Sequence, residues 1–384
     1  MPGEWGSSFL FRGTERYSLP TPSRIRKRNG PLPPLYEPQK SLLITGGGTG
    51  GHVVPAIEIA RAHQRFSSRP VLYAGTPGSL EERLASRAGI PFSPIRAGGV
   101  VGKSWSGKVS GVLAILRGTG SALGLVRDFR PGLVIGTGGY VQVPVIVAAR
   151  ILGIPIVLIE PNRVAGLANR VLGPLARRVV YGWSSDGGIP LAPDVRRPAP
   201  DRDRFEGRPL KILVMGGSQG ARVLNERVPE ILARTLPHIP SRSVEIIHQS
   251  GERWVESTRE RYQRLGLSVR VEGFLPEIAS LLGSQSLVIA RAGAMTVAEI
   301  TASGTPAIYC PFPHSAGGHQ KENARAVEES GGGWCWEEER LLGIESCAAD
   351  LARILSDSSL LYATGMGAWK LSPGVPASEW LSRL

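Results

Sequence analysis

The stretch that decides the fold is SLLITGGGTGGHVVPAIEIA at residues 41–60: an apolar run, a glycine-rich turn, then apolar residues at helical spacing. Such a turn lets backbone N–H groups approach a phosphate, and the following helix adds the partial positive charge of its amino end. Three further turns repeat the pattern: VIGTGGYV at 134–141, LVMGGSQGA at 213–221 and ARAGAMT at 290–296. Four such turns, divided between the two halves of the chain, predict two phosphate-bearing ligands that meet between two domains.

The residues around these turns alternate between strand-like and helix-like patterns. In the first half, strands are expected at 41–45, 70–74, 132–135, 154–159 and 178–181, and helices at 52–66, 79–88, 143–152 and 164–175. In the second half, strands are expected at 210–215, 244–248, 267–271, 287–290 and 306–310, and helices at 219–234, 253–265, 277–282, 295–303 and 320–329. This alternation predicts an α/β protein with two doubly wound parallel sheets, which bind ligands at the carboxyl ends of their strands.

The alternation breaks at 183–208, where prolines and mixed charges replace any periodicity. We interpret 191–208 as a linker between one domain at 40–190 and a second at 209–366. The last stretch, 367–384, is expected to form a helix that could pack back on the first domain. Residues 1–39 are rich in arginine and proline, lack the apolar segment of a signal peptide, and are expected to form a disordered basic tail.

The composition is ordinary for a globular enzyme, with 42% hydrophobic and 20% charged residues, but the formal net charge of +13 is not. Such a charge favours acidic partners: a phosphorylated substrate, an anionic membrane surface or nucleic acid. The three cysteines form no C-x-x-C pair and indicate a reducing compartment. Residues 103–130 mix apolar and basic side chains, as either a membrane-surface helix or a core-facing helix would. Gly118, Gly120 and Gly124 argue against one uninterrupted helix there.

Three other motifs have weaker interpretations. The spacing of Gly46, Gly48 and Gly51 matches a dinucleotide fingerprint, but no acidic residue ends the second strand to bind a ribose. The sequence around Ser218 matches G-x-S-x-G, yet no aspartate lies between it and the last histidine, as a hydrolase triad would prefer. Asp201 and Asp203 lie among prolines and arginines in the linker, so we expect a solvated charge run and no metal site.

His52 differs from the other histidines because a glycine turn places it at the start of a helix. The positive end of a helix disfavours a protonated imidazole, so the side chain remains available as a base near neutral pH.

Several stretches together resemble one family. They are ITGGGTGGHVVPAIEIA, GTGGYVQVPVIVAARILGIPIVLIEPNRVAGLANRVL, MGGSQGARVLN, HQSG and ARAGAMTVAEITASGTPAIYCPFPHSAGGHQKENA, in the order found in the MurG family. That family is the undecaprenyl-diphospho-muramoylpentapeptide β-N-acetylglucosaminyltransferases. The resemblance covers residues 41–333 and implies a GT-B fold, in which two Rossmann-like domains face a central cleft.

The resemblance also implies an activity. N-acetylglucosamine would pass from UDP-N-acetylglucosamine to lipid I, which is undecaprenyl-diphospho-MurNAc-pentapeptide, with inversion and formation of lipid II for peptidoglycan. It implies no cofactor and no metal. The expected location is the cytoplasmic face of the bacterial inner membrane, with peripheral attachment to anionic lipid, no nucleic-acid partner and possible contacts to cell-wall synthesis proteins.

Matching positions imply the residues of the donor site. Glu299 would hold both ribose hydroxyls, and the backbone of Leu275 would contact uracil. Asn162 would approach the sugar from the other domain. The remaining positions expected to bind UDP-N-acetylglucosamine are Thr49, Gly50, Gly51, Ser218, Gln219, Arg291, Ala294, Met295, Thr296, His319, Gln320 and Asn323. Arg291 has an alternative role, in a structural network.

The first half would bind the acceptor. Its diphosphate is expected at Gly47, Gly48, Gly138, Gly139 and Tyr140. His52 is the candidate general base for the acceptor hydroxyl, and Glu160 is the competing candidate base or an orienting group.

The chain departs from the family pattern at two places. The usual His-Glu-Gln-Asn is Ile159-Glu160-Pro161-Asn162, and the arginine expected near the diphosphate is replaced by Ala192. Arg196 or Arg197 is a conjectural substitute. Two other functions remain open: a related transferase with another UDP-sugar or lipid acceptor, and a basic protein that binds nucleotide sugars or nucleic acid without turnover.

Overall fold

The structure is a computed structural model that describes residues 34–95, 105–206, 209–217, 219–239, 243–275 and 278–384, without the side chains of residues 105–116 and 316. The predicted tail at 1–39 lies largely outside the described residues. Its last part is ordered, which corrects that boundary. The Leu35 N–H donates to the Leu384 carbonyl (2.6 Å), and the Tyr36 hydroxyl bonds His63 Nδ1 (2.9 Å).

The first half forms a parallel six-stranded sheet in the order β3-β2-β1-β4-β5-β6. Its strands are β1 (Leu42–Thr45), β2 (Val71–Gly75), β3 (Phe92–Pro94), β4 (Leu133–Gly136), β5 (Ile156–Glu160) and β6 (Arg178–Tyr181). Its helices are α1 (Gly50–Phe66), α2 (Leu80–Arg87), α3 (Trp105–Phe129), α4 (Val143–Ile151) and α5 (Leu167–Leu172). This is the predicted doubly wound order.

Alternate residues of β1 point into two separate cores. Leu42 and Ile44 pack with α1 and α2, whereas Leu43 packs with α3, α4 and α5. Because successive side chains of a strand point to opposite faces, the apolar run at residues 42–45 is explained by helices on both sides.

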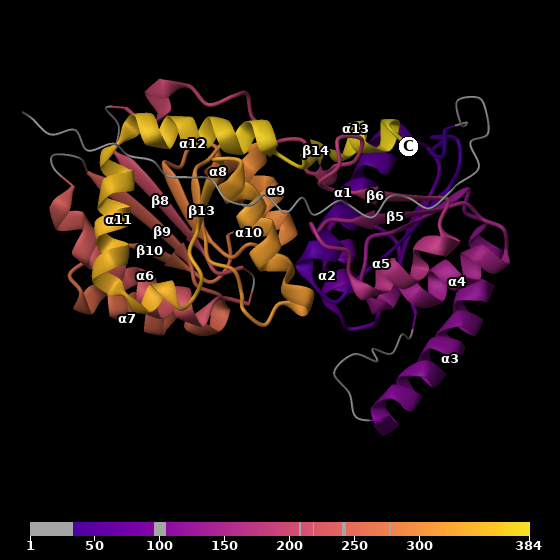
Figure 1. The fold of residues 1–384 in the computed structure, drawn as a ribbon. Coiled ribbons are helices and arrows are strands. Elements are labelled where there is room, and N and C mark those ends of the chain that lie inside the picture. The colour runs from indigo at the N-terminus through magenta and orange to yellow at the C-terminus, as the bar shows by residue number, and fades with distance from the viewer. Residues whose placement is uncertain (1–33, 96–104, 207–208, 218, 240–242, 276–277) are drawn as a thin grey trace, which may run out of the picture. The chain divides into compact units, whose positions relative to one another are not determined.

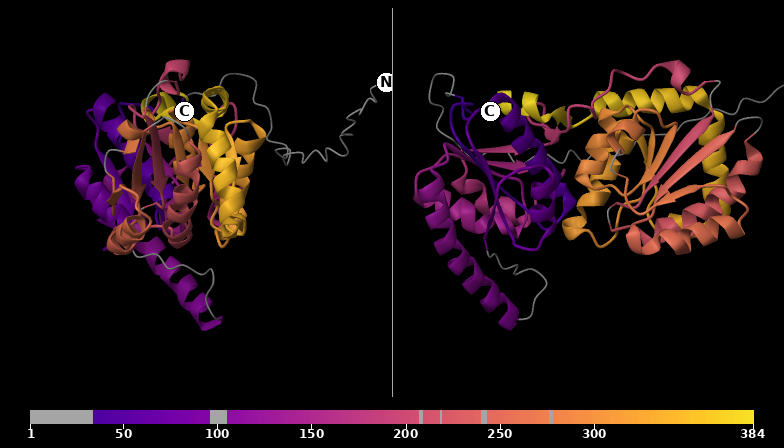
Figure 2. Two further views of the ribbon diagram at one scale, coloured as in Figure 1. Left: turned by 90° about the vertical axis from the view of Figure 1, so that its left-hand side faces the viewer. Right: turned by 180° about the vertical axis from the view of Figure 1, so that it is seen from behind.

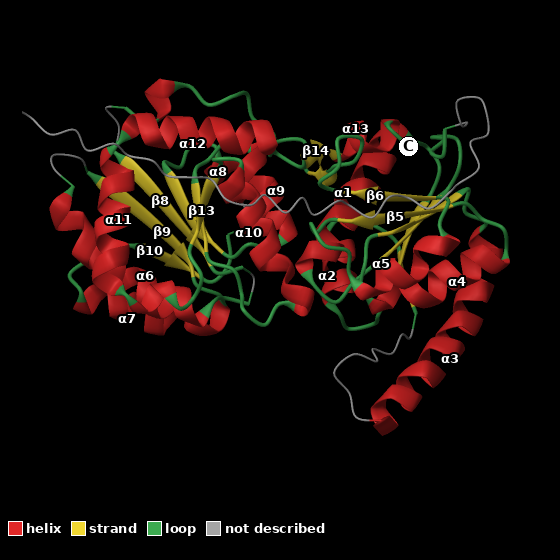
Figure 3. Cartoon of the chain, in the orientation of Figure 1, coloured by secondary structure: helices red, strands yellow, loops and turns green. Residues whose placement is uncertain are grey.

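The second half repeats the arrangement in the order β10-β9-β8-β11-β12-β13. Figures 1, 2 and 3 show helices packed around its sheet. Its strands are β8 (Leu210–Met215), β9 (Val244–Gln249), β10 (Arg270–Glu272), β11 (Leu287–Ala290), β12 (Ala307–Tyr309) and β13 (Gly333–Cys335). Its helices are α6 (Arg222–Thr235), α7 (Val255–Arg264), α8 (Ile278–Leu282), α9 (Ala294–Ala302), α10 (His319–Glu329), α11 (Ile344–Ser356) and α12 (Ser358–Leu371). Leu210, Ile212 and Val214 pack with α6 and α11, and Leu213 and Met215 pack with α8, α9 and α10.

The connection between the halves is structured, unlike the predicted linker. β7 (Ile189–Leu191) pairs in parallel with β14 (Gly374–Pro376), and α13 (Ala377–Ser382) then packs against α1. Arg204 donates to the carbonyls of Ser303, Leu282 and Gln285, among others, at 2.8 to 3.1 Å. Burial lowers the pKa of the Arg204 guanidinium to about 10. The segment thus lies anchored on the second sheet.

Residues 105–129 form the single helix α3, so the expected interruption by glycines is wrong. Added Cβ atoms on Gly120 and Gly124 would meet open space, and Ala122 and Val126 bury the helix against the first core. For residues 117–129 the structure therefore shows the core-facing alternative, with Arg117 and Arg127 exposed. Lys103 lies outside the described residues. No helix in the described part of the chain is both long and apolar enough to span a membrane.

Candidate functional site

The first glycine turn follows β1 and leads into α1. Gly48 has φ of 87° and, with Thr49, is exposed, whereas Gly47 is buried. A Cβ on Gly47 would lie 2.5 Å from Glu81 Oε1, so a larger residue there would displace the Glu81 side chain. α1 begins without a side-chain cap and without an acidic residue in its first turn. The first N–H groups of a helix have no partner within it, so Gly50 and Gly51 are suited to an anion.

The second glycine turn packs directly on His52. Gly138 and Gly139 have φ of 116° and 79°, and a Cβ on Gly138 would lie 2.5 Å from His52 Cδ2. A Cβ on Gly139 would lie 2.3 Å from the carbonyl oxygen of Gly47. Tyr140 follows with its side chain exposed. The structure thus brings the five predicted acceptor-diphosphate positions and His52 together.

The contacts of His52 define its tautomer. Nδ1 lies 3.1 Å from the carbonyl oxygen of Gly47, and a carbonyl only accepts. Nδ1 therefore carries the hydrogen, and Nε2 has the free lone pair that a base needs. Burial lowers the pKa of His52, His319 lowers it further, and the Gly47 carbonyl and the charge of Glu160 raise it in part. The imidazole is thus neutral at neutral pH.

Glu160 is the last residue of β5, and its carboxylate is almost fully buried and accepts several hydrogen bonds. Oε1 accepts from the backbone N–H and the side-chain amide of Asn162, both at 3.1 Å. Oε2 accepts from Gly166 N–H at 2.8 Å and from Asn169 Nδ2 at 3.0 Å. Four donors on this carboxylate favour the orienting alternative, because a proton from substrate would have to displace one of them.

The loop after Glu160 contacts the second half of the chain. Asn323 Oδ1 accepts from Arg163 N–H (3.0 Å), and its Nδ2 donates to the Ala292 carbonyl (3.2 Å) and approaches Asn162 Oδ1 at 3.5 Å. Asn323 is fully buried, so it orders this contact. The binding of sugar hydroxyls by Asn162 and Asn323 stays a prediction, and it would require an exchange of these partners.

α9 begins at Ala294 behind Gly293, which supplies no side-chain cap. The helix carries no acidic residue in its first turn, so the N–H groups of Ala294, Met295 and Thr296 face a site suited to a diphosphate. Glu299 lies one turn further and is half-buried. Burial, and secondly the charge of Glu58 on α1, raise the pKa of Glu299 to about 7.

This pKa predicts that donor binding depends on pH. A carboxylate accepts from both ribose hydroxyls, so the dissociation constant of UDP-N-acetylglucosamine should decrease as pH rises from 6 to 8 and Glu299 ionises. Calorimetry across this range measures it. Glu58→Gln should move the transition to lower pH, and Glu299→Gln should abolish it and weaken binding about tenfold or more. A wild-type affinity that is constant from pH 6 to 8 would contradict the assignment.

The remaining positions predicted to bind UDP-N-acetylglucosamine differ in whether other protein groups already occupy them. Gln219 is exposed in the third glycine turn, and Ser218 lies outside the described residues. The Leu275 side chain is in the core, which leaves its backbone for recognition. Arg291 donates to the Cys310 and Pro311 carbonyls and pairs with Glu338 at 2.5 Å. Arg291 therefore serves the structural alternative, and a phosphate contact would require it to leave these partners.

His319 and Gln320 begin α10. Nδ1 of His319 is buried and has no hydrogen-bond partner in the structure, so a ligand hydroxyl or phosphate oxygen would satisfy it. The charge of His319 is one of the causes that lower the pKa of His52. Gln320 Oε1 accepts from Phe312 N–H at 3.0 Å, which orients its amide.

Ala192 packs against the apolar cluster that contains Ala294 and Met295. The missing arginine would therefore have stood beside the first turn of α9. Arg196 donates to the Gly374 carbonyl at 3.1 Å and lies over the Trp369 ring, so its guanidinium is committed to the connection between the halves.

Sequence reasoning missed three polar residues of this site. Thr137 donates from Oγ1 to the backbone carbonyl of His52 at 2.7 Å, and Gln142 and Asn169 join the second glycine turn to Glu160. One sequence signal could have found such a residue. Asn169 is a polar side chain at a helical position where the apolar pattern predicts a core residue.

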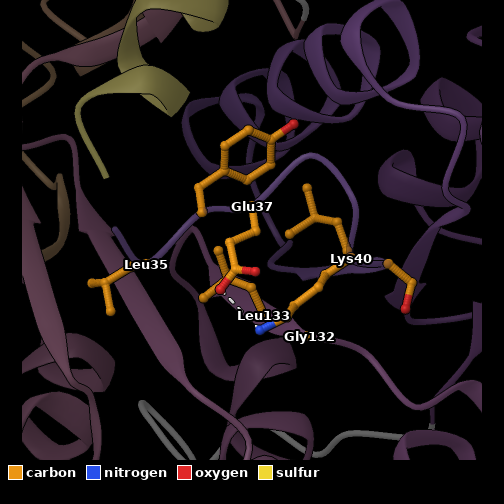
Figure 4. A pocket seen from close by; sticks show the side chains of 8 residues that line it. Leu35, Glu37, Lys40, Gly132 and Leu133 are labelled. Atoms are coloured by element: carbon orange, nitrogen blue, oxygen red, sulfur yellow. Dashed lines mark hydrogen bonds and ion pairs between the residues drawn. The ribbon is translucent and has the colours of Figure 1, made fainter. Parts of the chain in front are cut away.

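A shallow hollow elsewhere is not part of this site. Leu35, Glu37, Lys40, Gly132 and Leu133 surround it at the amino ends of β1 and β4, with a Lys40–Glu37 ion pair of 2.9 Å across it (Figure 4). The glycine turns follow the carboxyl ends of the same strands, at the opposite edge of the sheet.

Comparison with known proteins supports this geometry. Residues 42–181 match the model of the glycosyltransferase family 28 N-terminal domain, and residues 211–370 match that of its C-terminal domain. A curated relative from Pseudomonas aeruginosa is 40% identical over 327 residues, 83% of this chain and 89% of that protein. One from Burkholderia pseudomallei is 37% identical over 305 residues, 76% of this chain and 82% of that protein. Both are named UDP-N-acetylglucosamine–N-acetylmuramyl-(pentapeptide) pyrophosphoryl-undecaprenol N-acetylglucosamine transferase.

Solved structures agree. The crystal structure of MurG from Acinetobacter baumannii matches with a TM-score of 0.74 and 28% identity, over 89% of this chain and 98% of that chain. The calicheamicin glycosyltransferase CalG4 matches with a TM-score of 0.59 and 16% identity, over 88% of this chain and 95% of that chain. At that identity only the fold is compared, and the predicted two-domain glycosyltransferase fold is confirmed.

Proposed function

Since the chain belongs to glycosyltransferase family 28 and, within it, to the MurG family, we propose that it transfers N-acetylglucosamine from UDP-N-acetylglucosamine to lipid I. The product is lipid II, and the chain is a hexosyltransferase of peptidoglycan synthesis. The observation that carries the mechanism is the pair of uncapped helix starts, α1 with His52 and α9 with Glu299, on halves that are in contact.

The second half binds the donor in this proposal. Glu299 accepts from the ribose diol, and the N–H groups at the start of α9 hold the diphosphate. As the bond to the sugar breaks, negative charge develops on the leaving UDP, and fixed N–H donors stabilise it without reorganisation. His319 Nδ1, unpartnered in the structure, donates to or accepts from the transferred sugar or its phosphate.

The first half binds the acceptor and removes its proton. The turns at Gly47–Gly48 and Gly138–Gly139 receive the diphosphate of lipid I, beside His52. Nε2 of His52 takes the proton of the acceptor hydroxyl as the oxygen attacks the anomeric carbon from the face opposite UDP. One in-line displacement inverts that carbon, so an α-linked donor gives a β-linked product. No metal ion takes part in this route.

Peripheral attachment to the cytoplasmic face of the membrane also belongs to the proposal. Ile151 at the end of α4 and Leu167 and Val171 on α5 are exposed apolar side chains, and Arg150 and Arg170 are exposed nearby in the sequence. Apolar and basic side chains together favour a surface of anionic lipid. Contacts with other cell-wall synthesis proteins would form at the same membrane.

The activity is tested with purified protein, labelled UDP-N-acetylglucosamine and a lipid I analogue, in the presence of a chelator. Transfer to lipid I and not to diacylglycerol is the expected result. Transfer to diacylglycerol alone would indicate a different acceptor, donor binding without transfer would indicate a binding protein, and loss of transfer with the chelator would contradict the metal-free route.

Ala192 offers a gain-of-function test of the donor site. Ala192→Arg places a guanidinium beside the first turn of α9, where a charge-assisted hydrogen bond should lower the donor KM about tenfold. Ala192→Met is the matched control, because it adds bulk without charge. Equal KM values for the two variants would show that the diphosphate does not lie at this turn.

A further inference from the structure

A chain of hydrogen bonds runs through the first half from Glu160 to the second glycine turn. Asn169 Nδ2 donates to Glu160 Oε2 at 3.0 Å, and Gln142 Nε2 donates to Asn169 Oδ1 at 2.7 Å. The Gly138 N–H then donates to Gln142 Oε1 at 3.0 Å. Gln142 is fully buried, and Glu160 and Asn169 are 1% and 5% exposed. Water therefore does not replace these contacts, and each amide depends on the next.

The direction of every donor in this chain is determined by groups that can only accept or only donate. Asn169 Nδ2 also donates to the Ile159 carbonyl at 2.8 Å, so a flipped amide would direct its oxygen at two acceptors. Asn169 must therefore present Oδ1 to Gln142, and Gln142 must present Nε2 to Asn169 and Oε1 to Gly138. The carboxylate of Glu160, which only accepts, therefore fixes the orientation of both amides together with the Ile159 carbonyl and the Gly138 N–H.

The chain continues through backbone to the candidate base. The Gly47 N–H donates to the Gly138 carbonyl at 3.2 Å, and the Gly47 carbonyl accepts from His52 Nδ1 at 3.1 Å. Gly138 also packs on the imidazole, where an added Cβ would lie 2.7 Å from Nε2. Gln142 thus holds Gly138 through its N–H, the Gly138 carbonyl holds Gly47, and the Gly47 carbonyl holds the hydrogen on Nδ1 of His52.

We propose that Gln142 and Asn169 are positioning residues for the transfer reaction. They join the buried carboxylate of Glu160 to the Gly138 and Gly47 peptides, and so keep the free lone pair of His52 on Nε2, aimed at the acceptor. The inference rests on the proposed function, because it assigns these residues to the base of that reaction. It also gives Glu160 a defined task, since its carboxylate is one of the acceptors that orient the amides next to the candidate base.

The test uses Gln142→Met, which keeps the length of the side chain and removes both hydrogen bonds. The matched control is Gln285→Met in the second half. Gln285 is also buried, and among the described residues its amide donates to Leu281 and Ser284, both close to it in the sequence. We expect Gln142→Met to lower kcat about tenfold or more, since small displacements of reacting groups have such effects, and to leave the donor KM within about twofold. Gln285→Met should leave kcat within about twofold at temperatures where both variants are folded.

A second measurement reads the tautomer directly. The chain has 6 histidines, so ¹⁵N-histidine spectra with a His52→Gln sample for assignment identify the His52 signals. In the wild type, Nδ1 should carry the hydrogen and Nε2 should not. In Gln142→Met and Asn169→Leu, both tautomers should be populated, and Gln285→Met should match the wild type.

Wild-type kcat and an unchanged tautomer in Gln142→Met would overturn the inference. An equal loss of kcat in Gln285→Met would overturn it as well, because the effect would then be general destabilisation. If the wild type transfers no sugar to lipid I, the proposed function fails, whereas the tautomer measurement still decides whether the chain of hydrogen bonds acts on His52.

Discussion

Replacing His52 with alanine is expected to lower kcat for sugar transfer by about 100-fold or more, because the acceptor hydroxyl loses its general base. The affinity for UDP-N-acetylglucosamine should stay near normal, since the contacts proposed for its ribose and diphosphate lie on α9. The pH dependence of kcat/KM provides a second test of His52 as the base. Burial lowers the pKa of His52, so the acidic limb of the wild-type profile of kcat/KM should lie below the ordinary histidine pKa. His52→Ala should have no such limb.

His52→Gln is the matched control for this prediction, because its amide can still donate to the Gly47 carbonyl but provides no base. Both variants should lose activity to a similar extent. Turnover near the wild-type value in either variant, with donor binding intact, would remove His52 from the role of base.

Replacing Glu160 with alanine is expected to lower the free energy of unfolding by about 3 kcal/mol, because four N–H donors in a buried place lose their acceptor. Denaturant unfolding of wild type and variant measures the difference. A change below about 1 kcal/mol would show that these donors find other partners.

Glu160→Gln separates the orienting role of Glu160 from that of a base. The glutamine keeps an acceptor oxygen but has no charge. In the wild type, the negative charge of Glu160 raises the pKa of His52. The acidic limb of the kcat/KM profile of Glu160→Gln should therefore persist and move to lower pH, and kcat should be reduced. If the limb disappears in Glu160→Gln and persists in His52→Ala, then Glu160 is the base.

The strands with long apolar runs were predictable from the sequence almost to the residue. β6, β8 and β11 have the predicted bounds. The runs of β8 and β11 are buried almost throughout, whereas β6 lies at the sheet edge and is only partly buried. β3, β7, β13 and β14 were not predicted. Each has three residues, too few for a period, and each forms only because a neighbouring strand offers a parallel partner.

Other errors have a packing cause. α12 was not predicted because Gly365 and Gly367 weaken its helical pattern, yet both are needed where other chain segments touch the helix. A Cβ on Gly365 would lie 2.7 Å from the Gly304 carbonyl oxygen. His63 lies in a polar helical stretch, which is typical of the surface, but it is fully buried and bonds the Tyr36 hydroxyl and the Arg69 carbonyl. Residue type alone does not show that a partner from another segment will satisfy a polar group.

By itself, the sequence determined that the protein has two doubly wound halves and that each offers glycine turns to a phosphate. These features are local, since a strand, a turn and a helix start are adjacent in the chain. Only the tertiary structure decided which groups are free. It occupied Arg291 with Glu338, set Glu58 beside Glu299, and joined Glu160 to His52 through Asn169, Gln142 and Gly138. Those pairings depend on contacts between residues far apart in the chain, and burial makes each of them specific, because an unpaired polar group in the core is costly.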